Sequence, residues 1–325
     1  MKMMLFTLKR IRSVPLKIFF FLLSFQILVL QGQSTGGIPQ VASGVLVRWQ
    51  HFDSKYIGKR TVDIWRPFVL DDTVVAYSVL YMNDGQMLFD SKVTWNHQEW
   101  KIDETLQAFI NEGKVPPTMV VGIWNGGSKR HSEFFPQKVF ENMNAETRQW
   151  CAQNGRNYSV GGDSFSALSD NYLKFIVEEL KPAIDSLFFV KKDPQNTFIG
   201  GSSMGGLISM YAMCEYPQVF GGALCFSTHW PGVWKVEDNP IPGEILRYMN
   251  EHLPVPGNNK WYFDLGNQTL DALYPGIQAQ VDSQLHKAGF NETNWITRFF
   301  KGDDHSEKSW SRRFGAAYWW LNPQR

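Results

Sequence analysis

The spacing of apolar residues changes along this chain, from the short runs of buried strands to the three- and four-residue spacing of helices. The strongest helical pattern covers 171–187, where apolar side chains recur on one face. Pro182 interrupts that pattern and predicts a kink. A helix is also expected over 99–111, and a last one over about 307–320. Other helix-like segments separate the later strands.

Apolar runs typical of buried strands alternate with these helices. We expect such strands over 74–82, 119–124, 197–200, 220–227, 261–265 and 295–300. Before them, strand cores at 45–47 and 61–65, with Gly58 in the turn region, favour a β-hairpin. The pattern predicts the α/β class: one doubly wound domain with a mostly parallel twisted sheet, helices on both faces and an antiparallel start.

The segment 126–170 is the least regular part of the chain. Long irregular segments in such folds often rim a site, although a surface insertion without a role has the same appearance. Both interpretations remain open on the sequence alone.

The N-terminal residues predict a secretory signal peptide. Basic residues precede an apolar run over 18–30, small residues follow near Gly32 and Ser34, and no acidic residue occurs before Asp53. The run is shorter than the roughly 20 residues of a membrane-spanning helix. We therefore expect a signal peptide over 1–33, a mature domain over 34–325, a secreted or periplasmic location and no stable membrane span after cleavage. An uncleaved anchor is the alternative.

Composition narrows the possible partners. The 325 residues are 43% hydrophobic and 19% charged, which is ordinary for a globular protein, and the net charge is +1. Without a basic stripe, nucleic acid is not expected as a partner. The three cysteines lack the C-x-x-C spacing of a zinc or redox site. Export would permit one disulfide, but Cys214 and Cys225 fit better as small buried hydrophobes.

Residues 201–205 read Gly-Ser-Ser-Met-Gly and match the pattern G-x-S-x-G. A strand-like run precedes them and a helix-like run follows, which is the context this pattern requires. The turn strains the backbone of its central serine, and the flanking glycines relieve the crowding. Ser203 is therefore the candidate nucleophile.

A serine hydroxyl needs a neighbouring base, usually histidine. His305 follows the last predicted strand, where catalytic groups of open α/β sheets collect. It also fits the chain order nucleophile, acid, histidine. His229 falls outside that order, so His305 is the candidate base.

The acid that orients this histidine must lie between Ser203 and His305, after a strand. Asp271 lies beyond the end of the strand at 261–265 and can reach the histidine from a loop. Asp264, within the strand, is a second candidate. Asp303 and Asp304 are further candidates, although either could instead cap the last helix.

Two backbone N–H groups are needed where negative charge develops on the substrate. One is expected from Met204, directly after the candidate nucleophile. The other is expected from Gly85 or Gln86, in the loop after the first central strand. The absence of a side chain on Gly85 would let the backbone approach the substrate closely.

Together these residues resemble the putative-esterase family of α/β-hydrolases, which includes enterochelin esterase-like, esterase D-like, feruloyl and acetyl-xylan esterase-like enzymes and the mycolyltransferases. The resemblance extends from about residue 43 to the C-terminus. The matching blocks are 79–89, 120–123, 175–185, 200–206, Tyr216-Pro217, 220–230, the strand ending at Gly266 and the loop at His305. One departure concerns the acid, because many relatives carry it at the positions occupied here by Gln268 and Thr269.

The resemblance implies serine ester hydrolysis through an acyl-enzyme, with neither a metal nor an organic cofactor. It favours a small-molecule or oligosaccharide ester as substrate, such as an acylated plant polysaccharide fragment or an ester-linked siderophore. Trp230 and Trp124 each end a predicted strand near the expected site. Either could stack on a sugar or an aromatic acyl group, and either could equally belong to the core.

Two other functions compete with hydrolysis. Acyl transfer, as in the mycolyltransferases, shares the acyl-enzyme, and a non-catalytic binding module could use the same scaffold. A glycosidase would require paired carboxylates flanking a sugar, and the sequence offers no identifiable pair.

Overall fold

The computed structural model describes residues 37–69, 75–155 and 165–324. The predicted signal peptide lies outside the described residues. Within them, no helix has the length and apolar character that crossing a membrane requires.

One eight-stranded sheet organises the domain, with the strand order β1-β2-β4-β3-β5-β6-β7-β8. The first two pairings, β1 with β2 and β2 with β4, are antiparallel, and all later pairings are parallel. The strands are β1 (Val45–Phe52), β2 (Arg60–Arg66), β3 (Ser78–Asn83), β4 (Thr118–Ile123), β5 (Thr197–Ser202), β6 (Gly222–Phe226), β7 (Lys260–Leu265) and β8 (Trp295–Phe299). The predicted hairpin, the parallel sheet and the α/β-hydrolase class are confirmed.

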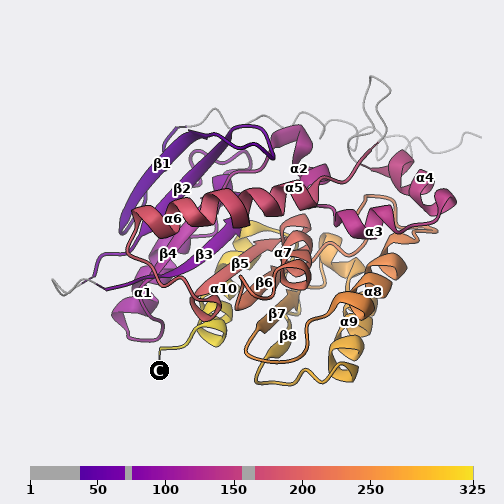
Figure 1. Cartoon of the computed structure of the whole chain (residues 1–325). Coiled ribbons are helices and arrows are strands. Elements are labelled where there is room, and N and C mark those ends of the chain that lie inside the picture. The colour runs from indigo at the N-terminus through magenta and orange to yellow at the C-terminus, as the bar shows by residue number, and fades with distance from the viewer. Residues whose placement is uncertain (1–36, 70–74, 156–164, 325) are drawn as a thin grey trace, which may run out of the picture. The chain divides into compact units, whose positions relative to one another are not determined.

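The sheet is covered on both faces, because side chains of a strand alternate between two hydrophobic clusters. In β3, Val79 and Tyr81 join one cluster, whereas Leu80 and Met82 join the other. Helices α5, α6, α7, α8 and α9 supply the first cluster, and α1 and α10 supply the second (Figure 1). The helices are α1 (Ile102–Asn111), α2 (Arg130–Phe134), α3 (Gln137–Glu141), α4 (Ala145–Asn154), α5 (Ser169–Lys174), α6 (Lys181–Leu187), α7 (Met204–Glu215), α8 (Ile241–His252), α9 (Pro275–Lys287) and α10 (Glu307–Leu321). Short η segments cover Gly85–Met87, Gly127–Lys129, Pro194–Asn196 and Thr269–Leu273.

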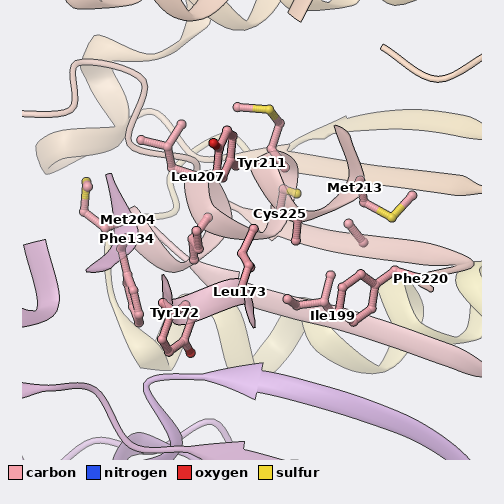
Figure 2. Packing of buried hydrophobic residues seen from close by; sticks show 14 of the residues in the cluster. Phe134, Tyr172, Leu173, Ile199, Met204, Leu207, Tyr211, Met213, Phe220 and Cys225 are labelled. Atoms are coloured by element: carbon pink, nitrogen blue, oxygen red, sulfur yellow. The ribbon is translucent and has the colours of Figure 1, made fainter. Parts of the chain in front are cut away.

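Helix α7 is apolar around its whole circumference, which identifies it as a helix packed inside the domain. Leu207, Tyr211 and Met213 of this helix pack beside Ile199 of β5 and Cys225 of β6 (Figure 2). The element that begins at the candidate nucleophile is therefore anchored in the core.

The helical pattern over 171–187 forms three consecutive segments. A π-helical segment, η3 (Phe175–Leu180), separates α5 from α6. Pro182 lies in the first turn of α6. A proline cannot donate to the preceding turn and its ring crowds that turn, so the wider π winding next to it accommodates the interruption.

The described part of the segment 126–170, expected to be irregular, contains the short helices α2, α3 and α4 and the start of α5. Helix α4 begins at an Asn144 cap, whose side chain accepts a hydrogen bond from the backbone N–H of Thr147.

All three cysteines, Cys151, Cys214 and Cys225, carry free thiols. Burial raises the pKa of Cys151 to about 12, as expected for a thiol packed as a hydrophobe.

Candidate active site

Ser203 forms the turn between β5 and α7 and has φ 59° and ψ −122°. Such a positive φ is strained for a residue with a side chain and persists only where the surroundings fix it. Here the N–H of Ser203 donates to the Phe226 carbonyl over 2.9 Å, and its own carbonyl accepts from the N–H groups of Leu207 and His229, each over 3.1 Å. The side chain lies at the carboxyl end of the sheet, and the residue is 8% exposed.

The two glycines that flank Ser203 are required by packing. A Cβ on Gly201 would lie 3.0 Å from Asn83 Cβ and 3.0 Å from the Gly205 carbonyl carbon. A Cβ on Gly205 would lie 3.3 Å from the same Asn83 atom. The glycines of the G-x-S-x-G pattern therefore permit the elbow to pack against the end of β3.

Asn83, the last residue of β3, fastens this contact with a buried amide. Its Nδ2 contacts the carbonyls of Gly200 and Gly205 at 3.0 and 3.2 Å and the Ser209 hydroxyl at 3.0 Å. Its Oδ1 accepts from the Tyr172 hydroxyl at 2.7 Å. Both the nitrogen and the oxygen of the amide are thus hydrogen-bonded. Asn83 therefore joins β5, before the elbow, to the first turn of α7, after it.

The candidate base and the preferred candidate acid are in contact. Nδ1 of His305 lies 2.6 Å from Oδ1 of Asp271. The backbone N–H of His305 also donates to the Thr269 hydroxyl over 2.9 Å. Asp271 belongs to η5 after β7, and His305 follows β8, so the parallel pairing of these two strands brings the side chains together.

Asp271 is completely buried and accepts two more hydrogen bonds, both at Oδ2. The Ser227 hydroxyl donates over 2.7 Å and the Gly266 N–H over 2.6 Å. Burial acts to raise the pKa of Asp271, but the hydrogen bonds from His305, Ser227 and Gly266 outweigh it and lower the pKa. The group is therefore held as a carboxylate.

The other three candidate acids have different partners. Asp264 pairs with Arg313, with Oδ1 and Nη1 3.4 Å apart. Asp303 accepts from Arg312 over 2.7 Å. Asp304 accepts from the hydroxyls of Ser306 and Ser309 at the start of α10. These three carboxylates thus contact residues other than His305.

A series of contacts connects Ser203 with His305. The N–H of His229 donates to the Ser203 carbonyl, and Nδ1 of His229 lies 2.8 Å from the Tyr274 hydroxyl. The Tyr274 ring in turn packs edge-on against the His305 ring, with centroids 5.8 Å apart. His229, which the sequence set aside as a base, is 1% exposed and joins the backbone of Ser203 to Tyr274, which packs against His305.

The loop after β3 forms the opposite side of the elbow. Asp84 adopts a left-handed conformation, with φ 57°, and begins the short helix η1 that contains Gly85 and Gln86. The first N–H groups of a helix have no partner within it, and this applies to η1 and to Met204 at the start of α7. The three predicted donors therefore stand at two helix N-termini beside the elbow.

Packing against β4 gives a steric reason for the glycine at position 85. A Cβ there would lie 2.3 Å from the Gly122 carbonyl carbon and 2.7 Å from the N of Ile123. The close approach that Gly85 permits is thus to the backbone of β4. The expectation that its missing side chain also lets the backbone approach the substrate stays a prediction.

Side chains from the segment after β4 hold the same loop. The Arg130 guanidinium donates two hydrogen bonds of 2.6 and 2.7 Å to the carboxylate of Asp84. Asn125 donates to Asp84 from its side chain over 2.7 Å and to Oε1 of Gln86 from its backbone over 3.2 Å. The irregular segment therefore has a role in fixing η1.

Of the two roles that the sequence left open for Trp230, stacking on a substrate and packing in the core, the structure shows core packing. Trp230 is fully buried, packs in a tilted arrangement against Phe263 with ring centroids 5.9 Å apart and donates its indole N–H to Gln278 over 3.0 Å. It is a core residue, because the chain turns inward directly after β6. Trp124 is half-buried; its N–H donates to Asp63 and Arg48 lies over its ring at 4.6 Å, which ties it to β1 and β2.

Trp234 is the aromatic residue that sequence reasoning missed. It is 57% exposed, and its ring lies 6.0 Å from the ring of His229. The available signal was its position: four residues beyond Trp230, it has passed the buried turn and reached the surface.

Within the described residues, no cluster of three or more His, Cys, Asp or Glu side chains could hold a metal ion.

Comparisons with known proteins agree with the fold and show the family. The model of the family described as Putative esterase matches residues 57–314. The chain therefore belongs to this family, and the resemblance found in the sequence is confirmed. It is also similar to the uncharacterised protein YbbA of Bacillus subtilis, with 23% identity over 271 residues, covering 81% of this chain and 93% of that protein.

Solved structures of the same fold include an enterobactin esterase of Shigella flexneri, with a TM-score of 0.57 and 16% identity over 87% of this chain. The match covers 60% of that enzyme's length. A ferulic acid esterase has a TM-score of 0.58 and 14% identity, covering 86% of this chain and 98% of its own. An IroE-like serine hydrolase from Shewanella oneidensis has a TM-score of 0.56 and 16% identity, covering 86% and 79%.

Proposed function

We propose that this protein is a secreted serine esterase that hydrolyses carboxylic esters with a triad of Ser203, His305 and Asp271. The observation that carries the proposal is the 2.6 Å contact between His305 and Asp271 at the edge of the sheet where Ser203 holds its strained turn. Family membership adds support, because the matched region includes all three residues.

In the first half of the reaction, Ser203 forms an acyl-enzyme. Because Asp271 is held as a carboxylate, Nδ1 of neutral His305 carries the hydrogen and Nε2 is free to accept one. Oγ of Ser203 attacks the ester carbonyl carbon as its proton passes to Nε2. N–H groups of Met204 and of Gly85 or Gln86 donate to the oxyanion. The carbon–oxygen bond of the ester then breaks, and the alcohol leaves with the proton from His305.

In the second half, water repeats the attack on the acyl-enzyme. His305 removes a proton from the water, and the acyl group departs as a carboxylic acid while Ser203 regains its hydrogen. Neither half requires an oxidant, reductant or cofactor.

A fluorophosphonate probe tests the proposal without knowledge of the substrate. Ser203 displaces fluoride and forms a phosphorus–oxygen bond, so the wild type becomes covalently labelled while Ser203→Ala does not. Absence of labelling of a folded wild type would instead favour a binding module. Equal labelling of Ser203→Ala would refute the nucleophile.

We propose esters that contain an aromatic acyl group as the substrate class, within the wider range of acylated carbohydrates and siderophore-type esters. Two of the similar structures belong to esterases named for such compounds, a ferulic acid esterase and an enterobactin esterase. The exposed ring of Trp234 contacts His229, whose N–H binds the Ser203 carbonyl. This ring therefore offers a stacking surface near Ser203.

Replacement of Trp234 tests the substrate class. Trp234→Ala should raise KM for methyl ferulate by about two- to tenfold while leaving p-nitrophenyl acetate hydrolysis unchanged. Trp319→Ala is the matched control, because Trp319 is similarly exposed, at 50%, but lies on α10. Equal KM values in wild type and Trp234→Ala would exclude this surface from substrate binding. Acetylated xylan and a catecholate siderophore complete the panel.

Acyl transfer is the alternative outcome for the same acyl-enzyme. Product analysis with and without an added sugar or alcohol acceptor separates the two, since a transferase forms a new ester where a hydrolase releases the free acid.

Export is tested separately by sequencing the N-terminus of the protein recovered outside the cytoplasm, where cleavage near residue 33 is expected.

A further inference from the structure

Ser227 connects Asp271 to charged groups deeper in the protein. It follows β6, is completely buried, and has a positive φ of 41° that a side chain rarely adopts. Its backbone N–H donates to the Asp264 carbonyl over 2.9 Å. This strained position places the hydroxyl between Asp271 on one side and α10 on the other.

The direction of the hydrogen bonds at Ser227 follows from its partners. Nε1 of Trp310 lies 3.0 Å and Nη2 of Arg313 lies 3.2 Å from Oγ of Ser227. An indole N–H and a guanidinium can only donate, so Oγ accepts from both. The single hydroxyl hydrogen is left for Asp271, 2.7 Å away. Ser227 is therefore compelled to act as a donor to the proposed triad acid.

Arg313 brings a buried charge to this network. Its side chain is 1% exposed and lies 3.4 Å from the completely buried carboxylate of Asp264. Nε and Nη1 of Arg313 are buried without a hydrogen-bond partner among the described residues. Burial raises the pKa of Asp264 to about 7, against the opposing effect of Arg313. The charge of the pair can thus change in the range where an esterase works.

We propose that Ser227, Asp264 and Arg313 are positioning residues that set the charge environment of the Asp271–His305 couple from behind. This inference rests on the proposed function, since it assigns a role relative to the triad. Ser227 holds Asp271 as an acceptor, Arg313 stabilises its negative charge, and Asp264 offsets the charge of Arg313.

Other charged groups lie close to these residues and are left unsubstituted in the test. Asp303, before α10, lies 3.8 Å from Nε of Arg313 and is also bound by Arg312. Glu307, in the first turn of α10, interacts with His305. Asp271 itself acts on Asp264, which adds to the rise in the pKa of Asp264 that burial causes.

Two charge substitutions should move the pH dependence in opposite directions. Asp264→Asn removes, with little change in shape, the negative charge that Asp264 gains as the pH rises through about 7, so protonation of the imidazole becomes less favourable and the acid limb moves to lower pH. Arg313→Gln removes a positive charge and moves the limb to higher pH. Shifts of about half a pH unit or more are expected. The double variant should return close to the wild-type position.

The rate of fluorophosphonate labelling, measured from about pH 5 to pH 9, is the readout. Wild-type labelling that depends on Ser203 establishes the proposed function independently of the variants. Given that, an unmoved limb in both variants, or shifts in the same direction, would overturn the inference. If Arg313→Gln does not fold, the shift to lower pH in Asp264→Asn decides the matter alone.

Ser227→Ala tests the link itself. It should slow labelling about tenfold to a hundredfold on the pH plateau, because a hydrogen bond to a charged group is lost and two buried donors lose their acceptor. Ser78→Ala is the matched control: its buried hydroxyl donates to Asn196 over 2.9 Å at the amino end of β3. An equal effect of both substitutions on stability, with no effect of Ser227→Ala on labelling, would reduce Ser227 to a structural residue.

Discussion

The imidazole of His305 and the carboxylate of Asp271 meet at 2.6 Å although they are 34 positions apart in the chain. Each residue follows its own strand, and β7 and β8 are neighbours in parallel register. The contact is therefore a product of the sheet, and a short segment of the sequence could not create it.

Asp271→Asn should lower kcat/KM by about 100- to 10,000-fold, because an amide holds the imidazole in the wrong tautomer. The loss should be smaller than that of Ser203→Ala. Asp264→Asn should cost far less turnover, since its carboxylate contacts Arg313. Steady-state kinetics on p-nitrophenyl acetate measures both. Greater damage from Asp264→Asn would transfer the role of the acid to that residue.

Ser203→Ala and His305→Ala should each reduce turnover by several orders of magnitude, and the double variant should be little worse than either. The reason is that nucleophile and base act on the same proton and are useful only together. A double-mutant cycle on kcat checks this. Additive losses would show that the two residues work independently.

Asn83→Ala should lower the free energy of unfolding by about 2–4 kcal/mol, because it leaves several buried polar groups without partners. Turnover should fall as well, since the amide ties both sides of the elbow to β3. Urea unfolding and kcat are the measurements. Asn154→Ala, which loses one hydrogen bond to the Trp150 carbonyl at the end of α4, is the control and should change little. Similar losses in both variants would contradict a special role for Asn83.

Gly85→Ala should destabilise the protein and displace η1, because the added methyl group would lie 2.3 Å from the Gly122 carbonyl carbon. Gly243→Ala is the opposite case: nothing lies within 4 Å of its added Cβ and it sits in α8, so a gain of about 0.5–1 kcal/mol is expected. Thermal unfolding distinguishes them. A stable and fully active Gly85→Ala would mean that the loop can retreat from β4 without cost.

Asp103 should make stability depend on pH. Burial, together with Glu104, raises the pKa of Asp103 to about 7 from 3.8. Its stabilising contribution is therefore complete below about pH 4 and lost as the pH rises through about 7. Asp103→Asn lacks this loss and can still accept from the N–H of Ala42. Relative to wild type, its free energy of unfolding should rise between pH 4 and pH 7 by on the order of a few kcal/mol. Parallel urea-unfolding results at both pH values would contradict this.

The fold was accessible from the sequence because each central strand is an apolar run between helix patterns. The predicted strand at 295–300 and the observed Trp295–Phe299 differ by one residue, and the last helix also agrees closely. The π-helical form around Pro182 was not accessible, because a proline predicts an interruption but not the winding that absorbs it. The short helices after β4 depend on contacts with distant residues, such as that between Arg130 and Asp84.

The candidate site was accessible where residue type and chain order coincide, as for Ser203, His305 and Asp271. The role of Trp230 stayed open because sequence position indicates which end of the sheet a residue occupies, but not whether its side chain turns inward. Ser227 left no signal, since its importance derives from donors on α10 that lie far along the chain. Buried networks of this kind become visible only in three dimensions.

The division of labour among the strands has a consequence for engineering. The groups proposed to transfer protons follow β5, β7 and β8, whereas Trp234 and the helices after β4 belong to connections that supply none of them. The connection after His229, which carries Trp234, can be exchanged for the equivalent loop of a relative, whereas an exchange after β4 must keep Arg130, because Arg130 holds Asp84 at the start of η1. New ester preferences should therefore be attainable by loop grafting on an unaltered chemical centre.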